Sequence, residues 1–303
     1  MASETVRAEG SAHVRPTAPQ EALALVRPWL DRRLLLASDF DGTLARLALD
    51  PWGAGIVDLA QRALRRLAAQ PGTHVAFISG RTVPDLARRV RVGGAEYLGD
   101  HGAQSAFAPR GFRAAALRYR SEPADPGARA MAQRLRDEVP RRIPEAWLVV
   151  EDKGSAVTFH FRSAPDIDAA RDRVRAAVEA LDPTGVLDQP GGRRAWELRP
   201  RGAMTKGRAL AALIGRHRPG LVLMLGDDRH DAEAFDIVRR ARAGGRLAGL
   251  AVAVVSPAGD PAEMADRADL LFADADACAR FLAGLARERA RRPVLGATPD
   301  DEG

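Results

Sequence analysis

The stretch Leu34-Leu35-Leu36-Ala37-Ser38-Asp39-Phe40-Asp41-Gly42-Thr43 decides the fold that we expect for this chain. An apolar run of this length, followed by a polar cluster and a glycine, is typical of a buried parallel strand. In open α/β sheets, ligands bind just beyond the carboxyl ends of such strands. Asp39 and Asp41 stand at i and i+2, so on an extended segment their side chains point the same way. Because two adjacent acids are costly unless a cation or a reacting group uses them, the pair predicts chemistry at this strand end.

The composition is that of a soluble globular protein. Of 303 residues, 46% are hydrophobic and 28% are charged, and no stretch approaches the ~20 apolar residues of a membrane helix. We expect no secretory signal, no membrane association and a cytoplasmic location. Cys278 is the only cysteine, which excludes an internal disulfide and a cysteine-built zinc site, and its apolar surroundings indicate packing.

The net charge of +6 could indicate a nucleic-acid binder, but the distribution of charge favours a solvated surface. The arginines are interleaved with acids, and aromatic residues make up only 5% of the chain, so there is no stacking platform. The 46 basic residues include only two lysines, Lys153 and Lys206. A compact ammonium fits where a planar guanidinium cannot, so both lysines are site candidates, the alternative being two leftover surface lysines.

Two outer parts of the chain show an alternation of helix-like and strand-like segments, and the part between them does not. The first part predicts helices at 20–32, 56–69 and 82–90 and strands at 34–39, 74–78 and 95–99. The last part predicts helices at 205–216, 231–242 and 275–289 and strands at 221–225, 250–255 and 269–272. Between them, strands at 147–150, 156–161 and 195–199 and helices at 125–138 and 166–181 indicate an α+β insertion. We therefore predict an α/β core over 21–105 and 199–290, an inserted cap over 106–198, and disordered tails at 1–20 and 291–303.

Four polar clusters follow the predicted core strands or begin a core helix. They are Asp39–Thr43, Ser79-Gly80-Arg81, Lys206, and Gly226-Asp227-Asp228-Arg229-His230-Asp231. Carboxylates from two strand ends can share one magnesium ion, which prefers oxygen ligands. A serine hydroxyl, loop N–H groups and a lysine can hold the oxygens of a phosphate. Together the clusters predict phosphoryl transfer, in which positioning and charge neutralisation dominate.

With these clusters in this order, the chain resembles the haloacid dehalogenase superfamily of aspartate-nucleophile phosphatases, and within it the trehalose-6-phosphate phosphatase family. The resemblance implies a Rossmann-like parallel-sheet core with a C2-type α+β cap. It implies that Asp39 is the nucleophile and that Asp41 transfers protons. It further implies that Ser79, Gly80 and Lys206 bind the phosphoryl group. Magnesium would be held by Asp39, the Asp41 backbone carbonyl, Asp227 and Asp231, with Asp228 as an alternative to Asp231.

A narrower part of the resemblance lies around the insertion. The segments are Gly99-Asp100-His101-Gly102-Ala103-Gln104, Glu151-Asp152-Lys153-Gly154, His160-Phe161-Arg162 and Glu197-Leu198-Arg199-Pro200. They imply sugar contacts from His101, Gly102, Glu151, Lys153, His160, Arg162 and Glu197. Plainer alternatives stay open: His160 as a packed histidine, Arg162 as a solvated edge charge and Glu197 in a surface ion pair. Arg81 has two open roles as well, pairing with a core carboxylate or with substrate.

Three positions depart from the pattern of this family. Gln104 stands where the family usually has Glu, and His230 and Ala232 replace Thr and Glu of its Gly-Asp-Asp-x-Thr-Asp-Glu motif. The expected activity is magnesium-dependent hydrolysis of a sugar phosphate through an aspartyl phosphate, with trehalose 6-phosphate as the first candidate. Sucrose phosphate, a glycosyl phosphoglycerate and a non-catalytic sugar-phosphate sensor are the alternatives. We expect a monomer or weak oligomer, and a trehalose-phosphate synthase is the protein partner that the resemblance suggests.

Overall fold

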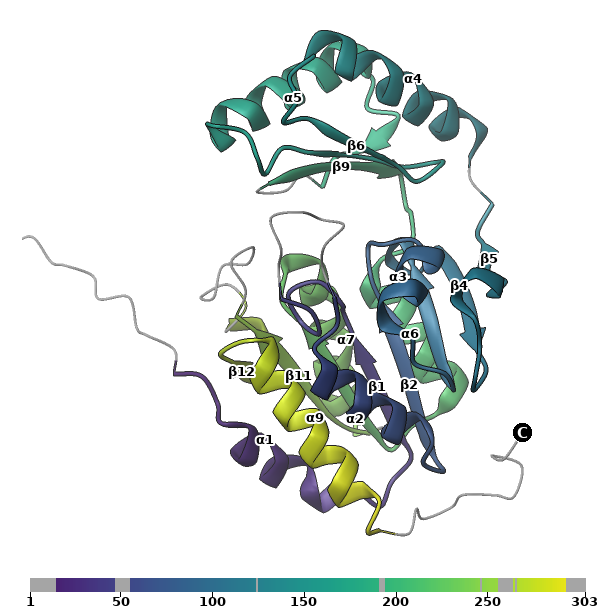
Figure 1. Ribbon diagram of the computed structural model, residues 1–303, viewed down its shortest axis with the longest axis vertical. Helices are drawn as coiled ribbons and strands as arrows, with labels where there is room; N and C mark the ends of the chain where they lie inside the picture. Colours follow the sequence, from purple (N-terminus) through teal and green to yellow (C-terminus); the bar gives the residue numbers. More distant parts are fainter. Residues whose placement is uncertain are drawn as a thin grey trace, which may run out of the picture.

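A large, mostly parallel sheet forms the centre of the molecule (Figure 1). The computed structural model describes residues 15–46, 55–123, 125–190, 194–245, 247–255, 264 and 266–292. The sheet has the strand order β12-β11-β10-β1-β2-β3-β4-β5, and its strand pairs are parallel except for β3–β4 and β4–β5, between which β4 runs in the reverse direction. Its strands are β1 (Leu34–Ser38), β2 (Thr73–Ile78), β3 (Ala95–Gly99), β4 (Gln104–Ala108), β5 (Arg120–Ser121), β10 (Leu221–Gly226), β11 (Ala248–Val254) and β12 (Leu270–Phe272).

Helices cover both faces of this sheet, so its central strand β1 is buried along its whole length. Every residue of β1 is buried, as expected for a parallel strand between two helical layers. One hydrophobic core lies between the sheet and the first layer, which comprises α1 (Pro19–Val26), α2 (Asp58–Ala68), α3 (Val83–Val90) and α9 (Ala275–Arg289). A second core lies under α6 (Lys206–His217) and α7 (Arg229–Ala243).

A smaller α+β unit lies above the carboxyl end of the large sheet (Figure 1). Its four antiparallel strands have the order β6-β7-β9-β8. Two helices pack on the outer face of this small sheet through their own hydrophobic core, and the other face is turned toward the large sheet. The elements are α4 (Pro126–Arg142), β6 (Val149–Asp152), β7 (Val157–His160), α5 (Ile167–Leu181), β8 (Leu187–Asp188) and β9 (Ala195–Pro200).

The order of the strands creates a switch point next to β1. The chain passes from β1 to β2 on one side and later returns to β10 on the other side. In open α/β sheets, such a reversal leaves a crevice at the carboxyl ends of the strands, where ligands bind. The loops after β1 and β10 therefore meet at one place.

The predicted fold class, an α/β parallel-sheet core with an inserted α+β unit, is confirmed, but two predicted boundaries differ from the structure. Residues 15–20 do not form a disordered tail: the Thr17 N–H donates to the Leu271 carbonyl at 2.6 Å, and α1 begins at Pro19. The expected start of the insertion at residue 106 falls inside β4, which pairs with β3 in the large sheet. Residues 1–14 and 293–303 of the predicted tails lie outside the described residues.

None of the helices in the described ranges is long and apolar enough to cross a membrane.

Candidate functional site

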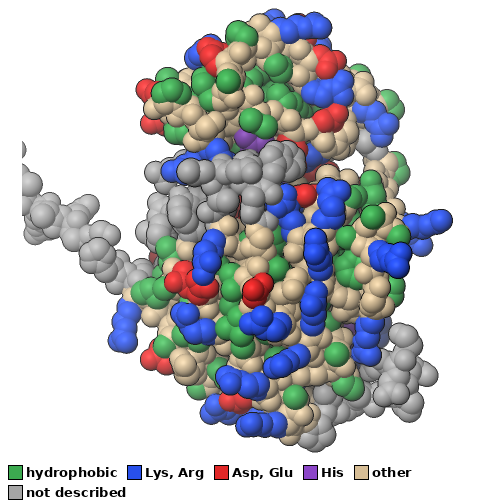
Figure 2. Space-filling view, viewed as in Figure 1, with side chains coloured by type: hydrophobic (Ala, Val, Ile, Leu, Met, Phe, Trp, Pro, Cys, Tyr) green, Lys and Arg blue, Asp and Glu red, His purple; other side chains and the backbone are tan. Residues whose placement is uncertain are grey.

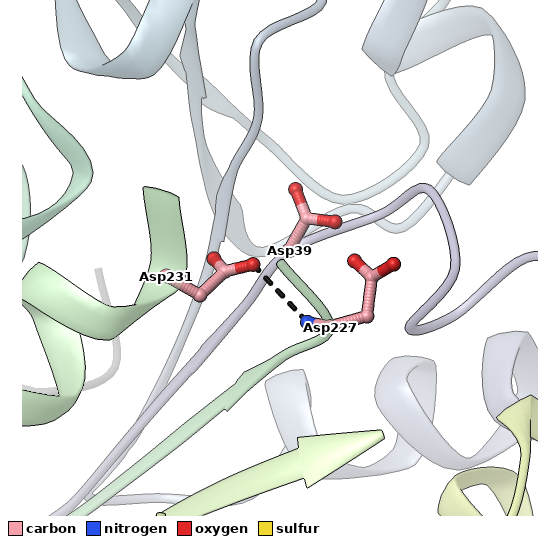
Figure 3. A group of neighbouring side chains, drawn as sticks. All are labelled: Asp39, Asp227 and Asp231. Carbon is pink, nitrogen blue, oxygen red and sulfur yellow. Dashed lines mark hydrogen bonds between the residues drawn. The ribbon is translucent and has the colours of Figure 1, made fainter. Parts of the chain in front are cut away.

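Three buried carboxylates meet at the switch point between β1 and β10. Asp39 follows β1, Asp227 follows β10, and Asp231 lies in the first turn of α7. One oxygen from each lies within 4.8 Å of the other two. Figure 3 shows the three side chains converging, with the Asp227 backbone N–H donating to Asp231 Oδ2 at 3.1 Å. Two segments far apart in the sequence thus build one acidic cluster.

Two glycines allow the carboxylates to approach the backbone. Gly42 has φ +76°, and a Cβ built there would lie 2.0 Å from Asp227 Oδ2. A Cβ at Gly226 would lie 2.3 Å from Asp231 Cγ. Glycine is required at both positions, because a side chain would displace a carboxylate and, at Gly42, would also adopt an unfavourable φ.

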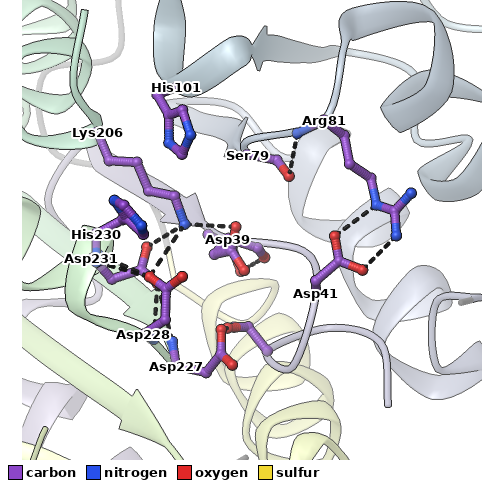
Figure 4. Close-up of polar contacts among 12 residues, drawn as sticks. Asp39, Asp41, Ser79, Arg81, His101, Lys206, Asp227, Asp228, His230 and Asp231 are labelled. Carbon is purple, nitrogen blue, oxygen red and sulfur yellow. Dashed lines mark hydrogen bonds and ion pairs between the residues drawn. The ribbon is translucent and has the colours of Figure 1, made fainter. Parts of the chain in front are cut away.

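Lys206 joins two of these carboxylates. It is the first residue of α6, whose start is fixed by the Thr205 hydroxyl accepting from the Arg208 N–H. Its Nζ donates to Asp39 Oδ1 and to Asp231 Oδ1, both at 2.8 Å, and its side chain is 3% exposed (Figure 4). A buried ammonium of this kind is tolerated only with such partners.

The cluster holds more negative charge than Lys206 can neutralise. Burial raises the pKa of Asp39 to about 6, with the charges of Asp228 and Asp41 acting in the same direction and Lys206 opposing them. Burial also raises the pKa of Asp231. Although burial opposes it, the surrounding carboxylates raise the pKa of Lys206. Lys206 therefore stays protonated, and the excess of carboxylates suits a further cation.

The donor set of the cluster fits a hard divalent cation. Asp39, Asp227 and Asp231 offer carboxylate oxygens from three directions, and no histidine or cysteine ligand joins them among the residues that the structure describes. Magnesium and calcium are bound by oxygen ligands of this kind. Asp228 does not belong to the group. Its Oδ1 instead caps α7 by accepting from the N–H groups of His230 and Asp231 at 2.9 and 3.3 Å.

Asp41 does not point toward the acidic cluster, which corrects the expectation of two parallel carboxylates. Arg81 holds it through two bonds, Nε–Oδ2 at 2.6 Å and Nη2–Oδ1 at 2.7 Å (Figure 4). The reason is local, because β1 ends at Ser38 and the chain turns at Gly42, so the alternation of an extended strand does not continue through Asp41. Of the two roles open to Arg81, the structure shows pairing with carboxylates, since its Nη1 also binds Asp85 at 2.7 Å.

Ser79 and Gly80 lie at the end of β2, on the same edge of the sheet. Ser79 is buried, and its hydroxyl accepts from the Arg81 N–H at 3.3 Å. A Cβ at Gly80 would lie 3.1 Å from the ring of His101. The loop after β2 is therefore placed beside both Asp39 and the segment after β3.

His101 links the large sheet to the α+β unit. It follows β3, and Asp100 and His101 have φ values of 47° and 56°, a costly conformation that tends to occur at functional sites. His101 Nε2 lies 3.1 Å from Glu197 Oε2, and Lys153 Nζ lies 2.9 Å from Glu197 Oε1. Although burial opposes it, Lys153 and His101 hold the pKa of Glu197 well below its usual range. Glu197 is thus a buried carboxylate in β9, not part of a surface ion pair.

Of the remaining predicted sugar-contact residues, two form a hydrogen-bonded pair and two lie at separate positions. His160 Nε2 binds Glu151 Oε2 at 2.9 Å across β6 and β7. Arg162 is half-buried just after β7. Gly102 lies on the side of the large sheet, where a Cβ would contact Ala209 of α6 at 2.7 Å. The two lysines of the chain therefore have comparable surroundings, since each is buried beside acids of the candidate site.

The structure shows what two departures from the expected motif do. Gln104 Oε1 accepts from the Val83 N–H at 2.9 Å and so satisfies the start of α3. His230 places its ring 5.3 Å from the ring of His101, and burial lowers its pKa to about 4. Neither contact could be read from spacing, because each joins residues far apart in the chain. Ala232 is buried in the first turn of α7.

Comparison with known proteins identifies the family. A family model described as trehalose-phosphatase matches residues 37–263, which is most of the chain. The chain belongs to the trehalose-phosphatase family. The match includes all four polar clusters and the inserted α+β unit.

Several curated relatives of this trehalose-phosphatase family member come from mycobacteria. It is 34% identical over 242 residues to the trehalose-phosphate phosphatase of Mycobacterium leprae, a match that covers 74% of this chain and 52% of that protein. It is 39% identical over 234 residues to an uncharacterized glycosyl hydrolase of Mycobacterium tuberculosis, covering 74% of this chain but 17% of that protein. The chain thus spans about half the length, or much less, of these relatives.

Solved structures share the fold. The C-terminal domain of the C. albicans trehalose-6-phosphate phosphatase superposes with a TM-score of 0.72 at 20% identity, covering 90% of this chain and 99% of that one. The C-terminal domain of the Candida albicans trehalose synthase regulatory protein has a TM-score of 0.63 at 12% identity, covering 89% and 99%. At these identities the likeness concerns the fold alone, which is shared by proteins named as a phosphatase and as a regulator.

Proposed function

We propose that this protein is a magnesium-dependent phosphatase that hydrolyses trehalose 6-phosphate to trehalose and phosphate. The observation that carries the proposal is the ion pair between Lys206 and Asp39 inside the buried carboxylate cluster. A carboxylate can attack a phosphate dianion only where neighbouring cations neutralise the repulsion. Membership of the trehalose-phosphatase family supports the choice of substrate.

In the proposed reaction, an Asp39 oxygen attacks phosphorus while the bond from phosphorus to the sugar oxygen breaks. Asp41 gives a proton to the departing sugar oxygen and then takes one from the water that hydrolyses the aspartyl phosphate. Lys206, Ser79 and the backbone at Gly80 hold the phosphoryl oxygens. Asp39, Asp227, Asp231 and the Asp41 carbonyl would hold magnesium, which supplies positive charge for the phosphoryl oxygens when bound.

The α+β unit supports a role in selecting the sugar. His101, Lys153 and Glu197 link the two sheets, and Glu151 and His160 lie on neighbouring strands of the small sheet. Charge-assisted groups of this kind suit a polyhydroxylated ligand, in which many hydroxyls need partners. We propose that these residues, with Gly102 and Arg162, contact the sugar and that the unit closes over the site to exclude water.

Phosphate release from a substrate panel tests this function. The panel contains trehalose 6-phosphate, sucrose 6-phosphate, a glucosyl phosphoglycerate and glucose 6-phosphate, each with magnesium or with EDTA. We expect magnesium-dependent release that is fastest from trehalose 6-phosphate, and none from the Asp39→Asn variant. Equal rates on glucose 6-phosphate would reject the disaccharide assignment. Binding of trehalose 6-phosphate without turnover by the unmodified protein would identify a sensor.

A cytoplasmic location, a monomeric or weakly oligomeric state and a trehalose-phosphate synthase as partner stay predictions of the sequence. Size-exclusion chromatography of the protein alone and with a synthase would test the last two.

A further inference from the structure

An arginine-lined pocket lies outside the candidate active site. It has a volume of about 700 Å³, within the range of small-molecule sites. The carboxyl-terminal ends of α2 and α3 and the segment after β4 form its walls. Its charged lining residues are Arg65, Arg88, Arg91, Arg110 and Arg113, and Phe112 is its aromatic lining residue.

The pocket is at the opposite end of the sheet from the carboxylate cluster. Its loop follows Ala108, which pairs with Ala95 at the amino end of β3. The carboxylate cluster lies beyond the carboxyl ends of β1 and β10. A ligand in this pocket would therefore not touch Asp39 or Lys206, and the pocket needs an explanation of its own.

The five arginines of the lining have one nearby acid among the described residues, Asp85. Within the described part of the chain, Arg88 is the one lining arginine with a carboxylate partner, Asp85 at 3.6 Å. Asp85 is already bound by Arg81 and Arg89 at 2.7 and 2.9 Å. Figure 2 shows basic side chains gathered over the helical layer that contains α2 and α3.

The pocket differs from another arginine-rich part of the chain in how its arginines are compensated. On α5, where arginines are also frequent, they alternate with acids and pair with them: Arg171 with Asp168 at 3.0 Å and Arg175 with Asp172 at 3.4 Å. The arginines of α5 are thus compensated by acids on their own helix, whereas four of the five pocket arginines form no ion pair within the described residues.

Several of the pocket arginines are held in place by helix ends. Arg65 donates to the Arg91 carbonyl at 2.9 and 3.1 Å, Arg91 Nε donates to the Arg88 carbonyl at 2.8 Å, and Arg110 donates to the Ala69 carbonyl at 3.4 Å. These bonds cover carbonyls whose partial negative charge would repel an anion. A guanidinium has five N–H donors, so each arginine keeps further donors for a ligand while its position is already restricted.

We propose that this pocket binds a small molecule that carries two or more phosphate groups on an organic body. Arginine pairs with phosphate through two parallel bonds, and the five guanidiniums require several negative charges for compensation. The half-buried ring of Phe112 and the neighbouring alanines offer apolar contact to the organic part. A single orthophosphate would leave most of a pocket of this volume unfilled.

Calorimetric titration of the full chain in magnesium buffer at 150 mM salt tests the proposal. The probes are ADP, fructose 1,6-bisphosphate and pyrophosphate, with orthophosphate and adenosine as controls for charge number and organic body. ADP represents nucleotides and fructose 1,6-bisphosphate represents sugar bisphosphates. We expect at least one of them to bind more tightly than pyrophosphate, and the two controls to bind least. Failure of both to bind at millimolar concentration would overturn the proposal, as would equal affinity for pyrophosphate.

Reversing the charge of two lining arginines tests whether the ligand binds in this pocket. The Arg110→Glu/Arg113→Glu variant should weaken binding by at least about 50-fold, the loss expected when charge-assisted bonds to phosphate disappear. Arg118→Glu/Arg134→Glu is the matched control, because both residues are exposed, lie outside the lining and change the net charge equally. Thermal melting and phosphate release verify that both variants are folded. Unchanged affinity in the pocket variant, or equal losses in both variants, would place the ligand elsewhere.

Discussion

Arg81 binds the carboxylate of Asp41 at two points, with both nitrogen–oxygen distances below 2.8 Å. These two bonds occupy both carboxylate oxygens of Asp41. In the proposed reaction Asp41 must donate a proton to the leaving sugar oxygen, so this pair has to open during each turnover. The α+β unit supplies a competing charge, because Glu151 and Arg81 interact electrostatically across the gap between the two sheets.

Replacing Asp41 should affect substrates according to their leaving group. Asp41→Asn removes the proton donor, so we expect kcat on trehalose 6-phosphate to fall by about 10²–10⁴-fold, the usual contribution of general acid catalysis. The fall on p-nitrophenyl phosphate should be much smaller, because nitrophenolate leaves without a proton. Steady-state kinetics on both substrates measure the ratio. Equal losses would show that Asp41 has another role, and Asp39→Asn, inactive on both substrates, is the control.

Removing the ammonium of Lys206 should destabilise the protein, because the neighbouring buried carboxylates lose the cation that compensates their charge. Lys206→Met leaves Asp39 and Asp231 buried without a cation, which costs about 3–5 kcal/mol in the free energy of unfolding. Urea unfolding at pH 7 in EDTA measures this. Combining Lys206→Met with Asp39→Asn should restore at least half of the loss, because one of the unpaired charges disappears. If the double variant is no more stable than Lys206→Met alone, repulsion among these carboxylates is not the cause.

The link between the two sheets should depend on pH through Glu197. Its folded pKa lies below the ordinary value of 4.5, so the native state binds fewer protons than the unfolded state between these two values. The stabilisation is therefore complete above about pH 5 and is lost as the pH falls through the folded pKa. Glu197→Gln should cost about 3–5 kcal/mol at pH 7, since Lys153 is left buried and unpaired.

Urea unfolding at pH 7 and at pH 4 compares this variant with the unmodified protein, and the difference should shrink at pH 4. Glu145→Gln is the control, because Glu145 pairs with Arg173 at a half-exposed position and such pairs contribute less than about 1 kcal/mol. A difference that is the same at both pH values would contradict the role of the Glu197 charge.

Gln104 should act on α3 rather than on the sugar. Gln104→Leu removes the acceptor for the Val83 N–H and should cost about 1 kcal/mol in stability while leaving KM unchanged. Gln104→Glu keeps the acceptor and adds a negative charge at a helix start, so its stability should equal or exceed that of the unmodified protein. Thermal unfolding and steady-state kinetics measure the two effects. A rise in KM for Gln104→Leu with unchanged stability would instead indicate a substrate contact.

The core of the fold follows from the sequence because its local and global signals agree. The apolar run Leu34–Ser38 is a buried central strand as predicted, and Asp39, Lys206, Asp227 and Asp231 meet because parallel strands end at one edge. The point along the chain at which the large sheet ends and the insertion begins was harder to predict. The segment 104–108 has three half-buried residues and one exposed residue, so its pattern does not mark it as a strand of the large sheet.

Partners of long polar side chains could not be derived from spacing. The residue types Asp41, Arg81 and Asp85 permit several pairings, and the turn at Gly42 decides which one forms. The arginine pocket could not be predicted from the sequence for a similar reason. Arg65, Arg91 and Arg113 come from three separate segments, and each has the appearance of an ordinary solvated arginine in the sequence.

The burial of both lysines has a practical consequence for chemical probing. Lys153 and Lys206 have side chains that are 5% and 3% exposed, and the chain has no other lysine. An acylating reagent or a lysine-specific protease therefore meets no side-chain amine on the folded surface. Modification at Lys153 would report separation of the two sheets, and modification at Lys206 would report exposure of the buried carboxylate cluster. Two single-residue signals, resolved by mass spectrometry, would follow the opening of this molecule without any engineered label.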